Sequence, residues 1–179
     1  MKEQIMQFFL GLPDELYVFL ISMLPIIELR GAIPAGALLG LPFYINLPLS
    51  ILGNILPVPF ILIFISRILD FLEKFKTTRP VVTWLRRKAG KHKKRVLSDE
   101  EDVPESSQRK MTKALFWAMM LFVAIPLPGT GAWTGSLISA LFNIPKRKSF
   151  LAILIGVILS GIIMTLASYG VIGFLSFLI

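Results

Sequence analysis

The sequence predicts an all-α, polytopic integral membrane protein in which two inverted repeats are joined by a basic cytoplasmic loop. The first observation is composition: 55% of the 179 residues are hydrophobic and 17% are charged, whereas soluble domains carry about 25% charged residues. The second is that three uncharged stretches, 31–66, 114–145 and 149–179, each exceed the roughly 20 residues that cross a bilayer. The third is that proline and glycine interrupt two of the apolar regions.

The first repeat is expected to occupy residues 1–70. Its opening apolar run, 16–27, is too short to cross a bilayer, and acidic residues near the N-terminus argue against a cleaved signal peptide. The flanks of the segment 14–42 carry almost no positive charge, so we expect this segment to enter from the external side and return as a hairpin. A span over about 43–70 follows. The residues expected to break the hairpin are Pro25, Gly31 and Pro34.

Residues 71–113 are expected to form a cytoplasmic loop. They contain 13 of the 19 Lys and Arg residues but only 6 of the 11 Asp and Glu residues, and short loops rich in basic residues stay on the inner side of a membrane. Within the loop a basic run follows an apolar patch, a pattern typical of an interfacial helix lying on anionic lipid headgroups. An acidic connector follows at 98–107. The residues predicted to contact lipid are Trp84, Arg86, Arg87 and Lys88.

The second repeat is expected at residues 114–179. Basic clusters flank the uncharged stretch 114–145 on both sides, and a single crossing would leave one of them outside. A re-entrant hairpin over 114–145, followed by a span over 149–179, keeps both clusters in the cytoplasm. A proline-kinked single span is the alternative. The residues expected to form the break are Pro126, Pro128, Gly129 and Gly131.

The two halves also share short similar sequences. Residues 31–36 (GAIPAG) resemble 131–135 (GAWTG), and 51–56 (ILGNIL) resemble 154–159 (LIGVIL). A unit with one net crossing inverts its duplicate, so two such units form the inverted repeat used by many transporters. Because irregular backbone at membrane depth is tolerated only inside protein or along a cavity, both breaks are candidate functional sites.

Three blocks resemble the small multidrug export protein family: 24–36 (LPIIELRGAIPAG), 52–60 (LGNILPVPF) and 126–135 (PLPGTGAWTG). This resemblance implies a transport activity. The expected arrangement is similar to that of DedA/VTT membrane proteins, whose inverted re-entrant hairpins are associated with moving lipids between leaflets. DedA-like proteins place acidic residues in the first hairpin and arginines in the second, whereas here Glu28 and Arg30 both lie in the first.

Glu28 and Arg30 are the main candidates for chemistry, because an ionisable residue inside a membrane costs about 2.5–3.5 kcal/mol and usually faces a partner or a cavity. In the functional interpretation, Glu28 exchanges protons, since a desolvated carboxylate holds a proton more readily, and Arg30 binds phosphate or carboxylate. In the structural interpretation, they form an ion pair that holds the hairpin. Their spacing separates them on a regular helix, whereas an unwound stretch between Pro25 and Pro34 would let them pair or point into one cavity.

Three uncharged residues complete the predicted substrate or proton pathway: Asn54, Thr130 and Thr134. Asn54 would lie near mid-membrane and either bind substrate or hydrogen-bond to the first hairpin. Thr130 and Thr134 would cap or line the second break. Pro34 and Thr130 would each begin a half-helix, whose N-terminus favours an anionic group.

Several chemistries are excluded by what the sequence lacks. There is no cysteine, and the single histidine, His92, sits among basic residues, so neither a metal site nor a cofactor is expected. The chain has no phosphate-binding loop or nucleophile elbow, and none of its apolar stretches contains paired carboxylates, which argues against an enzyme and an ATP-driven pump. Because the basicity is confined to one loop, nucleic-acid binding is not expected either.

We therefore expect a small secondary carrier that exports amphipathic compounds or lipids by alternating access between the repeats, with proton coupling through Glu28. A homodimer is expected because two spans and two hairpins can hardly enclose a path. The expected location is a bacterial cytoplasmic (inner) membrane. The alternative is a non-transporting membrane scaffold or assembly factor whose basic loop recruits a partner or anionic lipid.

Overall fold

The computed structural model describes residues 12–72, 80, 83, 105–142 and 144–178, and within these ranges the regular structure is helical. The predicted lipid-contact residues Trp84, Arg86, Arg87 and Lys88 lie outside the described residues, as does His92. The helices, in chain order, are α2 (Asp14–Ser22), α3 (Glu28–Leu38), α4 (Phe43–Ile55), α5 (Pro57–Leu72), α7 (Glu105–Ala124), α8 (Ala132–Leu141) and α9 (Lys146–Leu178). An all-helical fold is thereby confirmed for the described residues.

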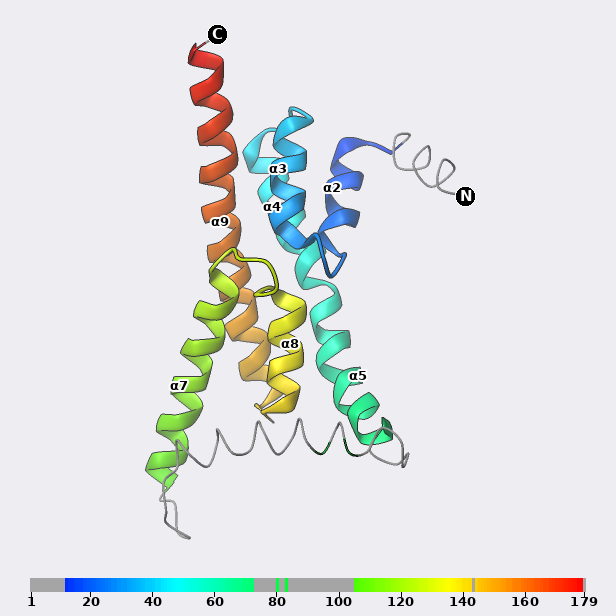
Figure 1. The fold of residues 1–179 in the computed structure, drawn as a ribbon, viewed down its shortest axis with the longest axis vertical. Coiled ribbons are helices and arrows are strands. Elements are labelled where there is room, and N and C mark those ends of the chain that lie inside the picture. Colours follow the sequence, from blue (N-terminus) through cyan, green and yellow to red (C-terminus); the bar gives the residue numbers. More distant parts are fainter. Residues whose placement is uncertain (1–11, 73–79, 81–82, 84–104, 143, 179) are drawn as a thin grey trace.

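Two helical hairpins occupy opposite halves of the molecule (Figure 1). The first hairpin is α2 and α3 with the connecting residues 23–27, and the second hairpin is α7 and α8 with residues 125–131. Figure 1 shows the two connecting loops at about the same height, beside the middle of α9. We name the two ends of the molecule the α3–α4 end, at residues 39–42, and the α8–α9 end, at residues 144–145.

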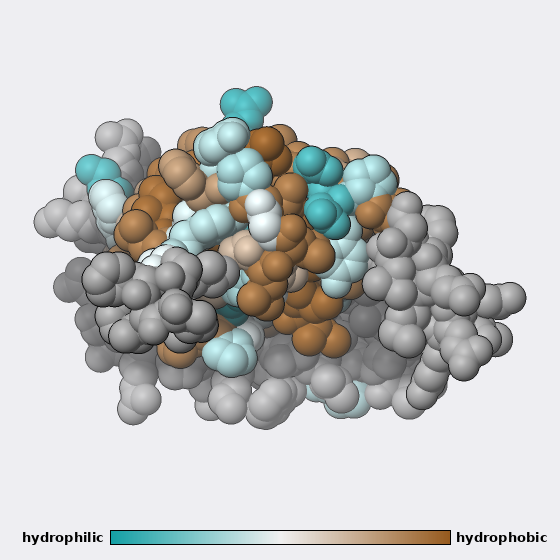
Figure 2. Space-filling view, turned by 90° about the horizontal axis from the view of Figure 1, so that it is seen from above, coloured by the Kyte–Doolittle hydropathy of each residue, from teal (hydrophilic) through white to brown (hydrophobic). Residues whose placement is uncertain are grey.

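Two apolar helical segments are long enough to cross a membrane: Phe43–Phe64, which runs through α4 and α5, and Lys146–Val171 in α9. Their most apolar windows have mean hydropathies of 2.1 and 2.7, yet only 28% and 33% of those windows are buried within the protein. Figure 2 shows apolar atoms over much of the described surface seen from the α3–α4 end. A largely apolar exterior on such helices is suited to lipid rather than water.

Local sequence explains several helix boundaries. Asp14 and Glu15 occupy the first turn of α2, where negative charge interacts favourably with the helix dipole. α4 and α5 are separated only at Leu56, because Pro57 has no N–H for the preceding turn and is instead suited to a first helical position. α3 is followed by Gly40, whose φ of +83° is accessible to glycine at little cost.

Pro34 and Gly31 do not interrupt the first hairpin, so the sequence-based expectation was wrong for both. They lie inside α3, and the break is confined to residues 23–27, which include Pro25. Nor does Pro34 begin a half-helix, since α3 begins six residues earlier at Glu28. Tertiary packing outweighs the local cost of the proline, because its neighbour Ile33 is fully buried in the core.

The core joins the two halves of the chain. Leu29 and Ile33 of α3 pack in one cluster with Val58 of α5, Val123 of α7 and Ile153 of α9. Lipid tails are as apolar as these side chains, so close van der Waals packing, rather than removal from water, supplies much of the stabilisation. Small residues permit this packing: a Cβ on Gly156 of α9 would lie 2.7 Å from the Met120 carbonyl oxygen of α7.

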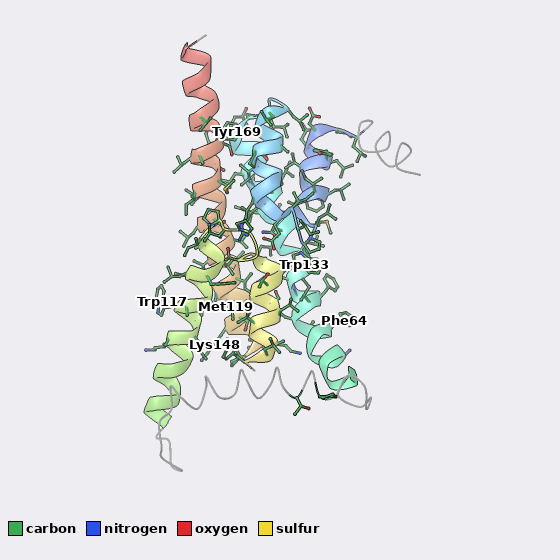
Figure 3. All side chains as sticks on the ribbon, viewed as in Figure 1. Phe64, Trp117, Met119, Trp133, Lys148 and Tyr169 are labelled. Carbon is green, nitrogen blue, oxygen red and sulfur yellow. The ribbon has the colours of Figure 1, made fainter. Side chains whose placement is uncertain are left out.

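A buried hydrogen-bond network ties α3, α4 and α9 together near the α3–α4 end. Asn46 Nδ2 donates to the Ile33 carbonyl oxygen at 2.8 Å and to Tyr169 Oη at 2.9 Å. Tyr169 Oη in turn donates to the Leu41 carbonyl oxygen at 2.6 Å. Figure 3 shows Tyr169 between α9 and the α3–α4 pair. The network fixes the long C-terminal helix to the N-terminal half.

Replacing Tyr169 by phenylalanine is expected to lower the free energy of unfolding by about 1 kcal/mol, because two interhelical hydrogen bonds are lost and each is worth about 0.6 kcal/mol in a membrane protein. Thermal unfolding in detergent measures the change. Tyr44→Phe is the matched control, since Tyr44 is 66% exposed. Equal unfolding temperatures for the two variants would contradict the assigned role of Tyr169.

Candidate functional site at the joint between the hairpins

The candidate site lies where the loops of the two hairpins meet, and Glu28 is at its centre. Glu28 is the first residue of α3 and only 4% exposed. Its φ of 51° lies in the left-handed region, a conformation that costs a non-glycine residue about 1–2 kcal/mol. Strain of this kind persists where surrounding contacts hold the residue in place, and it is concentrated at functional sites.

Glu28 reaches across to the start of α8. Its Oε1 accepts a hydrogen bond from the Trp133 backbone N–H at 3.3 Å, and Gly131 is the N-cap residue of the same helix. The first N–H groups of a helix have no intrahelical acceptor and carry partial positive charge. The carboxylate of α3 therefore serves as an N-terminal cap for α8, supplied by the other hairpin.

Arg30 reaches the opposite side of the same loop, just beyond the end of α7. Its guanidinium donates to the Leu127 carbonyl oxygen and, at 2.9 Å, to Thr130 Oγ1. Thr130 Oγ1 also lies 2.7 Å from the Ile125 carbonyl oxygen. Leu127 lies three residues beyond the end of α7, so the acceptors of Arg30 belong to the connecting loop. The two charges of the first hairpin thus bind the second hairpin at the N-terminus of α8 and at the loop that precedes it.

A further contact and a close approach complete the joint. Trp133 Nε1 donates to the Met23 carbonyl oxygen at 3.2 Å, and Figure 3 shows Trp133 at the height where the hairpin loops meet. At Gly131 there is no room for a side chain, because a Cβ there would overlap the Glu28 carboxylate. We define the joint as Glu28, Arg30, Leu127, Thr130, Gly131 and Trp133.

The ion pair inside the joint is loose. Arg30 Nη2 lies 3.9 Å from Glu28 Oε2, longer than the 2.7–2.9 Å of a charge-assisted hydrogen bond. Both residues lie in the first turn of α3, where Glu28 has a left-handed backbone. Because Arg30 bonds mainly to the second hairpin, the buried carboxylate is only partly compensated by its neighbour.

Asn54 is buried at the level of the first hairpin loop. It is 1% exposed, and neither atom of its side-chain amide has a hydrogen-bond partner within the described part of the chain. The adjacent Gly53 lies directly against Phe19 and Ser22 at the end of α2. Within the described residues, the hydrogen bond that Asn54 was expected to make to the first hairpin is therefore absent. Ser160 and Thr165 of α9 also have buried hydroxyls without a partner among the described residues.

The fold brings several of the predicted site residues together and leaves others apart. Glu28, Arg30 and Thr130 meet in the joint with Gly131, while Pro126, Pro128 and Gly129 lie in the same loop. Thr134 lies within α8 and makes none of the hydrogen bonds described for the joint. The half-helix begins at Ala132, not at Thr130, because Thr130 instead bonds Arg30 and the preceding carbonyls.

Sequence reasoning missed the Leu127 carbonyl and the Trp133 N–H, since backbone groups leave no signal in residue identity. It also missed Asn46. The recurrence of Asn46, Ser50 and Asn54 at every fourth position within an uncharged helix could have indicated a buried polar face.

A family model described as "Putative small multi-drug export protein" matches residues 28–163. The matched segment begins at Glu28 and contains every residue of the joint. No curated protein and no solved structure matches the chain. Because the match covers well over half of the 179 residues, and because the described fold has two helices able to cross a membrane, this chain belongs to the small multi-drug export protein family of membrane proteins.

Proposed function

We propose that the protein is a small proton-coupled carrier that exports amphipathic compounds, and that the joint is its gate. The observation that carries this proposal is the matching of charge across the joint. The acid of the first hairpin binds the N-terminus of α8, and the base binds a carbonyl and a hydroxyl of the loop between α7 and α8. A contact of this kind depends on the charge of a single carboxylate, so one proton can weaken it.

Protonation of Glu28 is the proposed switch. A neutral Glu28 is attracted less to the N-terminus of α8 and to Arg30, and a charge at a partly buried helix end is worth up to ~2 kcal/mol. Loss of that attraction lets the hairpins separate at their loops. When Glu28 loses its proton, the negative carboxylate draws the two hairpins together again.

In this mechanism the two halves of the chain form inverted repeats, and the hairpins are re-entrant from opposite sides of the membrane. Their opposed positions in Figure 1 support this arrangement. Alternate opening on the two sides of the joint would expose a path next to Asn54, whose amide has no partner among the described residues. Two copies of the chain are proposed to complete the path, and a bacterial inner membrane with the basic loop inside is the proposed setting.

Transport by the full chain in liposomes tests the proposal. Glu28→Gln is expected to abolish pH-gradient-driven efflux of ethidium while the protein remains folded, because glutamine keeps an oxygen for the Trp133 N–H but cannot exchange a proton. Glu15→Gln is the matched control, since Glu15 is an exposed acid on α2. A fluorescent phosphatidic acid is the second probe, so that lipid movement is measured in the same vesicles.

Each result bears on the choice between carrier and scaffold. Loss of efflux in Glu28→Gln with retention in Glu15→Gln supports the carrier. If Glu28→Gln moves ethidium as fast as the unmodified protein, the joint is a structural ion pair and not a proton switch. If the unmodified protein moves neither probe, the chain is not a carrier, and the scaffold interpretation replaces it.

A further inference from the structure

An apolar slot opens between the two helices of the second hairpin. It has a volume of about 220 Å³ and its described lining is entirely apolar. One wall consists of Leu115, Ala118 and Phe122 of α7, and the facing wall includes Ile138 and Phe142. Its size and lining are suited to part of a hydrocarbon chain.

Three cations stand just beyond one end of this slot. Ile144 lines the slot, and α9 begins two residues later with Lys146, Arg147 and Lys148, all of them exposed. The first turn of α9 contains no acidic residue, and within the described ranges none of the three forms an ion pair. Figure 3 shows Lys148 on the α7–α8 side, closer than Met119 to the α8–α9 end.

Positive side chains at the start of a helix are unfavourably placed, because the N-terminal end of the helix dipole is itself positive. An anion near Lys146 and Lys148 would relieve this repulsion. The apolar slot is therefore suited to a hydrocarbon chain, and the cations are suited to a negatively charged headgroup. A single molecule can carry both groups.

We propose that the slot binds an acyl chain of an anionic phospholipid, whose phosphate headgroup lies on Lys146 and Lys148. This site is separate from the joint and does not depend on transport. A free phosphate would leave the slot empty, and a zwitterionic lipid would leave the cations without net compensation. One anionic lipid, in the membrane leaflet at the α8–α9 end, would therefore occupy both the apolar slot and the cluster of cations.

Native mass spectrometry of the purified full chain tests the proposal. The protein is mixed with equal amounts of phosphatidylglycerol and phosphatidylcholine in neutral detergent, and retained lipid is counted. Phosphatidylglycerol is expected to be retained preferentially. Lys148→Gln should weaken its retention about fivefold, the value of one lysine at an anionic surface. Lys113→Gln is the matched control, because Lys113 is an exposed cation on the face of α7 that carries Trp117.

A second pair of variants tests the slot itself. Ala118→Phe fills the slot and should abolish preferential retention, whereas Ala114→Phe, on an exposed alanine outside the lining, should leave it unchanged. If Ala118→Phe does not fold, Ile138→Ala is the substitute variant, because it removes part of the facing wall without adding bulk. Equal retention of the two lipids, equal effects of Lys113→Gln and Lys148→Gln, or retention unaffected by the slot variants would each overturn the proposal.

Discussion

Gly131→Ala is expected to break the joint between the hairpins. The backbone at Gly131 has φ −85° and ψ −167°, which alanine adopts freely, so any effect arises from the added methyl group. That methyl would overlap the carboxylate of Glu28, which is buried and has little room to move. Overpacking of this kind costs about 1–3 kcal/mol. The unfolding temperature in detergent and the rate of ethidium efflux from liposomes should both decrease.

The effect of Gly131→Ala should depend on Glu28, and a double-mutant cycle measures this dependence. In a Glu28→Ala background the carboxylate is gone, so the methyl group at position 131 should cost little. We expect a coupling of about 1 kcal/mol or more between the two positions. Gly170→Ala is the control, because no heavy atom lies within 4 Å of the Cβ position there. Strictly additive effects would show that residues 28 and 131 are not in contact.

Gly53→Ala should destabilise the protein at least as strongly, at the contact between α2 and α4. A Cβ at this position would overlap both Ser22 Oγ and the Phe19 carbonyl oxygen. The carbonyl belongs to the backbone of α2 and cannot rotate away, so the helices must move apart. We expect the free energy of unfolding to fall by about 1–3 kcal/mol or more, measured by thermal unfolding against the Gly170→Ala control.

The Ser22→Ala background distinguishes this case from that of Gly131. Removing the hydroxyl leaves the Phe19 carbonyl in place, so the loss caused by Gly53→Ala should be recovered only in small part. Full recovery would mean that the serine hydroxyl alone sets the distance between α2 and α4. The two glycines thus differ in whether a side chain or a backbone opposes the added methyl group.

Much of the fold could be predicted because its signals are local. Long uncharged runs predict the apolar helices in 43–64 and 146–171, and the Pro-Gly-rich residues 126–131 coincide with a loop between two helices. The break near Pro25 could be placed less well, because Gly31 and Pro34 give the same local signal as true loop residues. Burial of Ile33 and the contact of Gly36 with Asn46 keep that part of the chain helical.

The candidate site was predictable only in part. Glu28 and Arg30 could be singled out by their rarity within apolar sequence, but their partners could not. Glu28 is paired with a residue 105 positions away, and Arg30 with residues 97 and 100 positions away. Two of these three partners, the Trp133 N–H and the Leu127 carbonyl, are backbone groups, which every sequence possesses.

By itself, the sequence determined that this chain belongs in a membrane, where its broken apolar segments lie, and which two charges are carried into them. The tertiary structure alone decided that Glu28 of the first hairpin caps the N-terminus of α8 and that Arg30 binds the loop before it. The physical reason is that unpaired N–H and C=O groups arise wherever a helix stops, and their partners depend on which chain segments meet in space. The local sequence indicates where a helix stops and its end groups need a partner. Only the packing of the hairpins provides that partner.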